Sequence, residues 1–414
     1  MNAKIISIGD ELLQGITINT NAAFLAEKLT NIGFRVDKIS DIADLRLSIT
    51  NELEESAGKY NLVLITGGLG PTSDDITKKV LCEFFGGEML ENTYVLEDIE
   101  KFLQQRNRTM NQSNRLQAQV PTSCKVIRNK FGTAPGMVFY KNNTVFVSMP
   151  GVPFEMQQMF MNDIVPFLRI ELGIENKPMK IIHLYDIPEA ELSEKLTELE
   201  KWLPEQIKLA YLPSPEDMKL KLISVACGNE RISEIMNKAV EKIEQTVGKY
   251  IWGYDEQTME SILGQFLNKK NATISTAESC TGGYLAHRIT SVSGSSKYFC
   301  GSCVAYSNEI KNKVLGVDNK VIEKYGAVSS QTVEKMAAGA LNLFNTDYSI
   351  ATSGIAGPTG ATETKPVGTT FIAVASKQKI VSKQFNFGSL REINIRRTAS
   401  MGLFMMINFL KNRL

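Results

Sequence analysis

The chain has 414 residues, of which 43% are hydrophobic and 22% are charged. These values are typical of a soluble globular protein and exclude a disordered or fibrous one. The 46 basic and 45 acidic side chains leave a formal charge of +1, without the broad basic face expected of a nucleic-acid-binding protein. We therefore expect a cytoplasmic protein with no direct nucleic-acid binding, no membrane span and no signal peptide.

The first 172 residues predict a three-layer α/β domain with a parallel-type sheet. Its first elements alternate along the chain: strand 4–8, helix 19–33, strand 34–39, helix 45–59 and strand 61–66. This alternation is typical of a parallel sheet that is covered by helices on both faces. Further along we expect a helix over residues 101–119 and a β-hairpin over 137–148 that turns at Asn142 and Asn143.

A glycine-rich loop, GGLGPTSDDIT at residues 67–77, follows the strand at 61–66. Glycine lets the backbone approach a ligand closely, and a helix N-terminus capped by Ser73 or Asp74 would offer N–H donors to a phosphate. Four carboxylates lie in this loop or near strand ends, where parallel sheets place their ligands: Asp10, Glu11, Asp41 and Asp75. Carboxylates beside a phosphate suit a divalent cation. The alternative is that Asp74 and Asp75 are only helix caps.

Residues 173–252 predict a smaller α+β domain. Its elements follow closely on one another: strand 180–185, helix 189–203, strand 218–226 and helix 230–247. This segment has neither a glycine-rich loop nor an acidic cluster, so we interpret it as a spacer domain.

The last predicted domain, residues 253–414, is of the α/β class and contains the stretch TAESCTGG at 276–283. A buried strand leads into this stretch and a helix over 284–290 follows it. Such a turn exposes a small nucleophile and points free backbone N–H groups above the helix N-terminus. Ser279 is our candidate nucleophile, and Cys280 is its rival because a helix N-terminus also lowers a thiol pKa. The alternative is an ordinary turn in which Thr281 caps the helix.

The remaining elements complete this last domain. They are a strand at 298–306, a helix at 307–315, a helix ending near 344, strands at 348–352 and 365–375, and a last helix with several arginines. Cys300 and Cys303 have the spacing of a metal or redox pair, but residues three apart in a strand face opposite sides. We therefore expect two buried or half-buried thiols there.

A serine nucleophile needs a base. His183 lies in the spacer, and His287 lies roughly 9 Å beyond its helix start at a rise of ~1.5 Å per residue, so a Ser-His-Asp triad is not expected. Lys311 is the better partner, in the first turn of a helix capped by Ser307 or Asn308. Burial and the helix dipole would lower its pKa, and a neutral amine can take the serine proton. The alternative is a solvated helix lysine.

Several motifs occur in one order along the chain. GDEL at 9–12, GGLGPTSDDIT at 67–77 and MPGVPFEM at 149–156 come first, and TAESCTGG, VAYSNEIK, GAVS, SGIAGPTG and KPVGT follow. With these motifs the chain resembles the CinA family of competence/damage-inducible proteins over essentially its whole length. The first group is similar to that family's molybdopterin-binding-like domain, and the second to its amidohydrolase domain, which deamidates nicotinamide mononucleotide.

The resemblance implies two activities and a homodimer. The N-terminal domain would use a divalent metal (Mg, Mn or Co) to cleave ADP-ribose to AMP and ribose 5-phosphate. The C-terminal domain would need no cofactor and would use the family's serine and lysine, which fall on Ser279 and Lys311, with Tyr306 nearby. The alternative, of another class, is a competence- or DNA-damage-associated regulatory protein that senses nucleotides in degenerate pockets.

The resemblance also implies binding residues, motif by motif. For the C-terminal site these are Glu278, Thr281, Gly282, Gly283, Ser353, Gly354, Gly357, Lys365, Arg391 and Arg396. For the N-terminal nucleotide site they are Gly67, Gly68, Gly70, Pro71, Thr72, Gly151 and Glu155, with the metal on some of Asp10, Glu11, Asp41 and Asp75. The family usually has an acidic residue after a late glycine where this chain has Ser389, so the phosphate contact stays open between Arg391 and Arg396.

Overall fold

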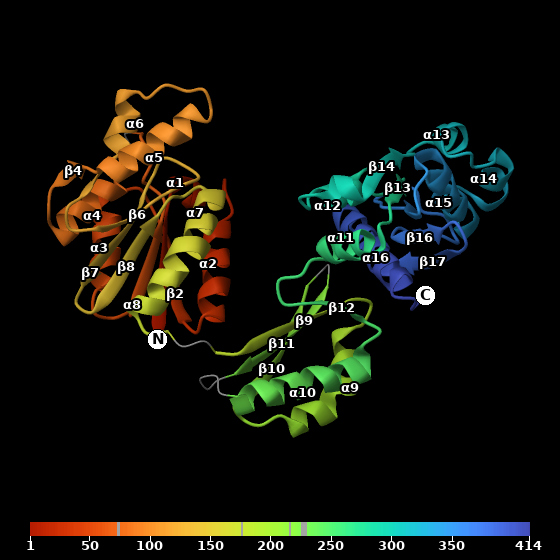
Figure 1. The fold of residues 1–414 in the computed structure, drawn as a ribbon, viewed down its shortest axis with the longest axis horizontal. Coiled ribbons are helices and arrows are strands. Elements are labelled where there is room, and N and C mark those ends of the chain that lie inside the picture. The colour runs from red at the N-terminus through yellow and green to blue at the C-terminus, as the bar shows by residue number, and fades with distance from the viewer. Residues whose placement is uncertain (73–74, 175–176, 215–216, 225–229) are drawn as a thin grey trace. The chain divides into compact units, whose positions relative to one another are not determined.

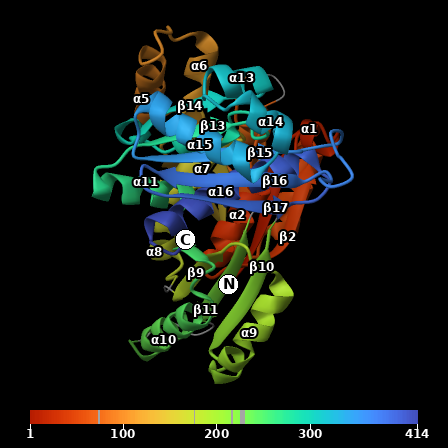
Figure 2. The same ribbon diagram turned by 90° about the vertical axis from the view of Figure 1, so that its right-hand side faces the viewer.

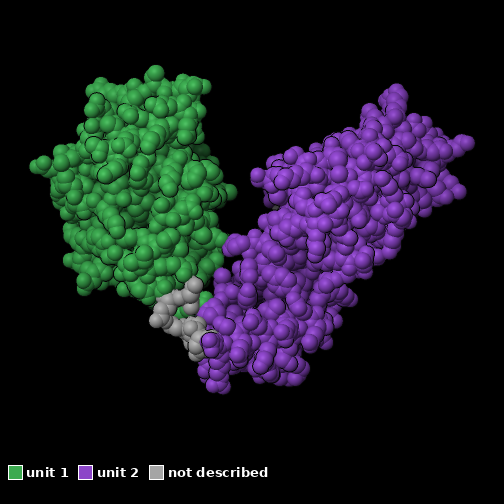
Figure 3. Space-filling model, in the orientation of Figure 1, with its two compact units in different colours: residues 1–177 green, residues 178–414 purple. Residues whose placement is uncertain are grey.

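The computed structural model describes residues 1–72, 75–174, 177–214, 217–224 and 230–414. The chain divides into two compact units, residues 1–177 and residues 178–414 (Figure 3). The first unit holds a six-stranded sheet, and the second holds a four-stranded and a five-stranded sheet (Figure 1). Within the described residues, no helix combines the length and the apolar character needed to cross a bilayer.

The six-stranded sheet of the first unit has the order β2-β1-β3-β8-β7-β6. Its strands are β1 (Asn2–Ile8), β2 (Arg35–Ile42), β3 (Leu62–Thr66), β6 (Lys125–Ile127), β7 (Gly136–Lys141) and β8 (Thr144–Met149). The strands β2, β1, β3 and β8 are parallel to one another. The strand β7 pairs antiparallel with β8, and β6 pairs antiparallel with β7. The predicted hairpin is confirmed, because Lys141 pairs with Thr144 across Asn142 and Asn143, which have φ angles of 50° and 62°. Asparagine tolerates this left-handed conformation.

Helices cover both faces of this sheet, as the alternation predicted. One face packs against α2 (Thr20–Asn31), α7 (Pro153–Met159) and α8 (Val165–Glu171), and the other against α3 (Arg46–Ser56) and α4 (Thr77–Phe85). Neighbouring residues of β1 point to opposite sides, so that Ile5 lies in the first core and Ile6 in the second. A short helix, α1 (Asp10–Leu13), directly follows β1.

The single helix predicted over 101–119 is wrong. The structure has two helices, α5 (Thr93–Gln104) and α6 (Gln112–Gln117). Asn107 lies between them with a φ of 53°, which a helix does not accommodate. Asn111 then starts α6 with a capping box. The end of the segment pairs as a strand, β5 (Gln119–Pro121), with β4 (Met89–Glu91).

The four-stranded sheet of the second unit is antiparallel, in the order β10-β11-β9-β12. Its elements are β9 (Met179–Leu184), α9 (Glu189–Trp202), β10 (Ile207–Pro213), β11 (Met218–Ser224), α10 (Glu230–Val247) and β12 (Ile251–Tyr254). The strands β10 and β12 were not predicted. Both lie at sheet edges, and β10 is mostly half-buried or exposed, so its apolar pattern is weak.

The five-stranded sheet has the order β14-β13-β15-β16-β17. Its first three strands are parallel, β16 pairs antiparallel with β15, and β17 pairs antiparallel with β16. The strands are β13 (Ile274–Glu278), β14 (Phe299–Val304), β15 (Tyr348–Gly354), β16 (Thr369–Ser376) and β17 (Ile380–Asn386). The helices are α11 (Met259–Lys270), α12 (Tyr284–Thr290), α13 (Asn308–Lys313), α14 (Asn319–Tyr325), α15 (Ser330–Phe344) and α16 (Arg391–Leu410). One face packs on α11, α12 and α16 and the other on α15 (Figure 2). The elements α14 and β17 were not predicted.

The middle segment shares a core with the C-terminal sheet. Tyr185 and Trp252, which lie at the ends of the four-stranded sheet, pack in the same cluster as Met259 of α11 and Phe404 of α16. The Tyr185 hydroxyl donates to the carbonyl of Arg397 at 3.2 Å. Residues interpreted from the sequence as a spacer are therefore joined to the C-terminal domain through buried side chains, which explains why the second compact unit contains both.

Candidate functional site

The turn that presents Ser279 is built by the end of β13 and two glycines. The backbone N–H of Ser279 donates to Thr352 on the neighbouring strand β15 at 3.0 Å, and Gly282 donates back to the Ser279 carbonyl at 3.2 Å. Gly282 and Gly283 have φ angles of 59° and 96°, in the left-handed region that favours glycine. The chain therefore reverses sharply between β13 and α12 and leaves the Ser279 side chain at the end of the sheet.

Glu278 caps the helix that follows this turn. Its carboxylate accepts the backbone N–H groups of Gly283 and Leu285 at 3.0 Å and of Ala286 at 2.8 Å, and its side chain is fully buried. The expectation of free N–H groups above the helix N-terminus is therefore wrong for these three groups. Glu278, considered as a substrate contact, instead stabilises the start of α12, since a carboxylate is favourable at that end of a helix dipole.

Lys311 meets Ser279 inside the protein. It is the fourth residue of α13, whose N-cap is Ser307 as the sequence suggested. Its side chain is 2% exposed, compared with 9% for Ser279. The Lys311 Nζ atom lies 3.2 Å from Ser279 Oγ, 2.8 Å from the Ala305 carbonyl and 3.4 Å from the Tyr306 carbonyl. The alternative of a solvated helix lysine is thus wrong.

The surroundings of Lys311 favour its neutral form. Burial lowers the pKa of Lys311, and among the described residues no carboxylate lies within ion-pair distance of Nζ to oppose this. Two of its three partners are carbonyls, which only accept hydrogen bonds, and the third is a hydroxyl. A neutral amine would donate to the two carbonyls and accept the Ser279 proton with its lone pair. Burial is the cause of the lowered pKa of Lys311. The dipole of α13, which was expected to contribute, belongs to a helix of only six residues.

Burial disfavours the reactive thiolate form of the cysteine next to Ser279. Burial raises the pKa of the Cys280 thiol to about 12, so the reactive thiolate is scarce near neutral pH. On β14, Cys303 is half-buried, and burial raises the pKa of its thiol. Cys300 is exposed, which corrects the expectation that both thiols would be buried or half-buried.

Arg391 contacts Tyr306, whose backbone carbonyl accepts a hydrogen bond from Lys311. Arg391 donates from Nη2 to the Tyr306 hydroxyl at 3.2 Å and from Nη1 to the Gly357 carbonyl at 2.8 Å. Gly357 has a φ of 92°, and a Cβ there would meet Val367 at 2.5 Å. Tyr306 is 62% exposed. An exposed guanidinium held by two contacts can still bind an anion, because its other N–H groups remain available.

Arg396 lies on another side of α16. It pairs with Glu392 at 3.0 Å and lines a cavity together with His183 of the middle sheet. Arg391 and Arg396 are five residues apart, which at 3.6 residues per turn separates them by roughly 140° around the helix. The structure therefore leaves Arg391 as the arginine next to Tyr306, a distinction that the helical spacing alone could have suggested.

Most of the other residues assigned to this site hold the loops together. Thr281 shares a hydrogen bond of 2.8 Å with Thr352, and not with the helix that it was suggested to cap, whose N-cap is Gly283. Ser353 donates to the Ala327 carbonyl at 2.7 Å. A Cβ on Gly354 would meet Thr370 Oγ1 at 2.6 Å, so the glycine permits close packing. Lys365 donates to the Tyr325 carbonyl at 3.1 Å.

The glycine-rich loop after β3 packs closely on the protein itself. A Cβ on Gly67, which has a φ of 102°, would lie 2.1 Å from the Ile8 carbonyl oxygen, and a Cβ on Gly151 would lie 3.3 Å from Gly67 Cα. A Cβ on Gly70 would meet the Asp75 carboxylate at 2.4 Å. Gly67 and Gly151 therefore allow backbone segments to pack closely on each other, and Gly70 leaves room for a side chain. Pro71 lies in this loop between Gly70 and Thr72.

Asp75 closes a turn and does not cap the following helix. Its carboxylate accepts the Thr72 backbone N–H at 2.9 Å and the Thr72 hydroxyl. The helix α4 begins at Thr77 with Ile76 at its N-cap. The predicted caps Ser73 and Asp74 lie outside the described residues.

Several carboxylates converge near the end of β1. Asp10 and Asp44 each accept the other's backbone N–H at 3.3 Å. Burial raises the pKa of Asp44, and the charges of Asp10, Glu11 and Asp75 act in the same direction. Asp44 was not predicted as a site residue, although its position just after β2 was a usable signal. Asp41 instead accepts from Asn19 at 2.5 Å.

Glu155 lies on α7 and is half-buried. It accepts from Asn129 at 2.8 Å, and burial raises the pKa of its carboxyl group. A Cβ on Gly132 would lie 1.8 Å from the Glu155 carboxylate, so this carboxylate fills the space beside a glycine. Among the described residues, no group of three or more His, Cys, Asp or Glu side chains is arranged to hold a metal ion.

Comparison with known proteins covers the whole chain. Residues 4–170 match the family described as "Probable molybdopterin binding domain", residues 179–253 match "Damage-inducible protein CinA KH domain", and residues 256–410 match "CinA C-terminal domain". The first unit thus has a molybdopterin-binding-like fold, and the four-stranded sheet with its helices is a KH-like domain.

Full-length relatives agree with these matches. A CinA-like protein of Cytophaga hutchinsonii is 42% identical over 397 residues, covering 96% of this chain and 95% of its own. One of Flavobacterium psychrophilum is 42% identical over 415 residues, covering 100% and 99%. The solved competence/damage inducible protein CihA of Agrobacterium tumefaciens is 33% identical, covers 37% of this chain and 95% of its own, and has a TM-score of 0.36. The chain therefore belongs to the CinA family.

Proposed function

We propose that this protein is a nicotinamide-nucleotide amidase, which converts nicotinamide mononucleotide and water to nicotinic acid mononucleotide and ammonia. The observation that carries the proposal is the 3.2 Å contact between Lys311 Nζ and Ser279 Oγ in a buried setting. Burial lowers the pKa of this lysine, and a lysine of lowered pKa can activate a serine as an amide-cleaving nucleophile. Membership in the CinA family is consistent with a hydrolase.

In the proposed reaction, neutral Lys311 takes the Ser279 hydroxyl proton while Oγ attacks the carboxamide carbon of the substrate. The tetrahedral intermediate collapses as the C–N bond breaks, and the nitrogen takes the proton from Lys311 and leaves as ammonia. Water then attacks the acyl-serine ester, with Lys311 again taking a proton and returning it to Oγ. The acid product leaves with its phosphate, for which Arg391 is our candidate contact because it is exposed beside Tyr306.

We further propose that the N-terminal domain cleaves ADP-ribose to AMP and ribose 5-phosphate with a divalent metal. The mutual contact of Asp10 and Asp44 supports this, because burial and the charges of Asp10, Glu11 and Asp75 raise the pKa of Asp44, and a cation would relieve that repulsion. The described residues do not hold a preformed group of three such ligands, so a bound metal would take further ligands from the substrate phosphates or from water. A bound Mg²⁺, Mn²⁺ or Co²⁺ would neutralise phosphate charge at this site. Asp41 accepts a hydrogen bond from Asn19 and has further acceptor sites, so it stays a candidate metal contact.

The test is to incubate the purified protein with nicotinamide mononucleotide and to measure ammonia release. We expect activity in the parent and in Cys280→Ala, and none above background in Ser279→Ala. The two variants change adjacent residues of one turn, so each controls for the folding of the other. An active Ser279→Ala with a folded but inactive Cys280→Ala would reverse the nucleophile assignment. A parent that binds the mononucleotide without releasing ammonia would instead favour a nucleotide-sensing regulatory protein.

A further inference from the structure

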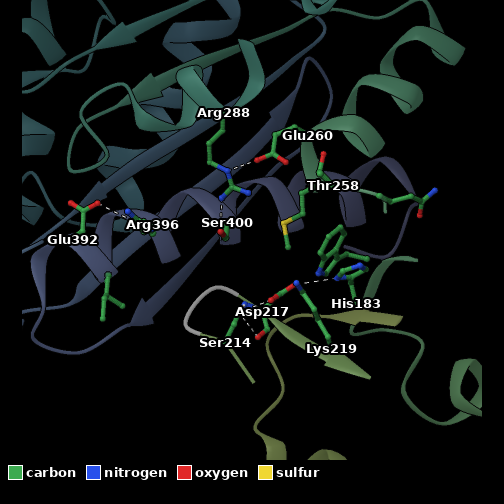
Figure 4. Close-up of a pocket in the computed structure, with 14 residues that line it drawn as sticks. His183, Ser214, Asp217, Lys219, Thr258, Glu260, Arg288, Glu392, Arg396 and Ser400 are labelled. Atoms are coloured by element: carbon green, nitrogen blue, oxygen red, sulfur yellow. Dashed lines mark hydrogen bonds and ion pairs between the residues drawn. The ribbon is translucent and has the colours of Figure 1, made fainter. Parts of the chain in front are cut away.

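The cavity lined by His183 and Arg396 lies inside the second unit, between the KH-like domain and the C-terminal domain (Figure 4). It has a volume of about 540 Å³, within the range of about 300–1,000 Å³ typical of small-molecule sites. Its walls come from β9, β11 and β12 of the KH-like domain and from α11, α12 and α16 of the C-terminal domain. The proposed amidase reaction does not use this cavity.

The acidic side chains of this cavity are already paired. Its three carboxylates have basic partners in the pairs Asp217–His183, Glu260–Arg288 and Glu392–Arg396. Asp217 lies 3.3 Å from its histidine and Glu392 lies 3.0 Å from its arginine. The cavity therefore offers little negative charge to a cationic ligand.

The unsatisfied groups of the cavity are donors. Lys219 is half-buried, and no acceptor among the described residues is within hydrogen-bond distance of its ammonium group. Arg288, whose side chain is 14% exposed, uses Nε for Glu260 and Nη1 for the Ser400 hydroxyl at 2.6 Å, which leaves the N–H groups of Nη2 without a partner in the described structure. Trp252 is 6% exposed, and its indole N–H is buried with no acceptor among the residues that the structure describes.

We propose that this cavity binds a small phosphate monoester, separately from the Ser279 site. The indole N–H of Trp252 is a buried donor, and leaving it unpaired costs about 1–3 kcal/mol. A ligand with acceptor oxygens would satisfy this group together with the ammonium group of Lys219 and Nη2 of Arg288. A phosphate monoester carries three strong acceptor oxygens and between one and two negative charges at neutral pH, which suits one lysine and one oriented arginine. The remaining volume holds the organic part of the molecule.

The site is connected to the Ser279 turn by two helices. Arg288 lies on α12, whose N-terminus is capped by Glu278 beside Ser279. Ser400, which holds Arg288, lies on α16, and the same helix begins at Arg391 of the amidase site. A ligand on this face would therefore contact the same two helices that form the wall of the proposed active site.

Tryptophan fluorescence tests the proposal directly, because the chain has only two tryptophans. The exposed Trp202 is replaced in Trp202→Phe, which leaves Trp252 in the cavity wall as the reporter. Inorganic phosphate and ribose 5-phosphate are titrated, with ribose as the uncharged control. We expect a saturable change with ribose 5-phosphate at a Kd of about 1 mM or tighter, and none with ribose. A saturable change with inorganic phosphate of equal affinity would assign binding to the phosphate group alone.

Two variants locate the ligand. Lys219→Gln should weaken binding at least about tenfold, which corresponds to the loss of a charge-assisted hydrogen bond, whereas Lys208→Gln, an exposed lysine of β10 outside the cavity, should bind as the parent does. Ser279→Ala should also bind as the parent does. The proposal is overturned if neither phosphate compound gives a saturable change in the millimolar range, or if Lys219→Gln binds with parental affinity.

Discussion

Replacing Lys311 with arginine tests the proposed base. Arginine keeps the positive charge but cannot lose its proton at working pH, so the Ser279 hydroxyl would lose its acceptor. General-base catalysis contributes about 10²- to 10⁴-fold, and we expect a loss of that size in kcat, or about 3–5 kcal/mol in the activation free energy. Because Lys311 is 2% exposed, the larger side chain should also cost about 1–3 kcal/mol of stability through overpacking.

A second variant separates chemistry from packing. Lys311→Met is close in volume but leaves the carbonyls of Ala305 and Tyr306 without their donor, which should cost about 1–3 kcal/mol for each carbonyl. Lys313→Arg is the matched control, because Lys313 is two residues further along, 67% exposed and paired with Glu309 at 2.6 Å. Ammonia release and urea unfolding are measured on the same preparations. A folded Lys311→Arg that releases ammonia at close to the parental rate would refute the assignment.

Amidase activity should depend on pH in a direction set by the pKa of Lys311. Burial lowers the pKa of Lys311, so the neutral amine and the amidase activity should increase as the pH rises through that lowered pKa. The folded state disfavours the ammonium form, so stability is reduced below the folded pKa and recovers as pH rises toward the unfolded value of about 10.4. Lys311→Met should lose this part of the stability profile. Parental activity that falls over the same pH range would contradict a neutral base.

The turn and the N-terminal domain give the other predictions. Glu278→Gln should lower the free energy of unfolding by about 2–3 kcal/mol in urea titrations, because one amide oxygen replaces a buried carboxylate with three N–H donors. Gly283→Ala should cost about 1–2 kcal/mol in the same assay, because its φ of 96° is unfavourable for alanine. Tyr306→Phe should raise KM about 2–10-fold with little change in kcat, since Arg391 loses one contact. A chelator should abolish ADP-ribose cleavage, followed as AMP formation, and leave ammonia release unchanged.

Local features of the sequence predicted much of the fold. The alternating apolar segments around residues 4–66 gave the layers of the first sheet, and Asn142 and Asn143 gave the hairpin because asparagine accepts a positive φ. The strand before the stretch at 276–283, the turn within it and the helix after it were also predicted, and the structure has them as β13, the turn and α12. The edge strand β10 was missed because half-exposed strands carry a weaker apolar pattern than buried ones.

The roles of the polar residues depended on tertiary contacts. Glu278 is next to the nucleophile in the sequence, but its carboxylate turns inward and holds α12. Asp44 belongs with Asp10 because β1 and β2 are parallel neighbours that end together. Residue type and spacing do not report which backbone N–H groups a carboxylate will reach, so these roles could not be predicted.

Residue types and their order were enough to predict a small nucleophile at a glycine-rich turn after a buried strand, and both glycines of that turn have left-handed φ angles. They also identified Lys311 as the better candidate base. The contact between the two side chains depends on tertiary structure, since they are 32 residues apart. The parallel pairing of β14 with β13 and the return of the chain through α13 bring them within 3.2 Å. The same packing buries the lysine, and burial is what lowers its pKa.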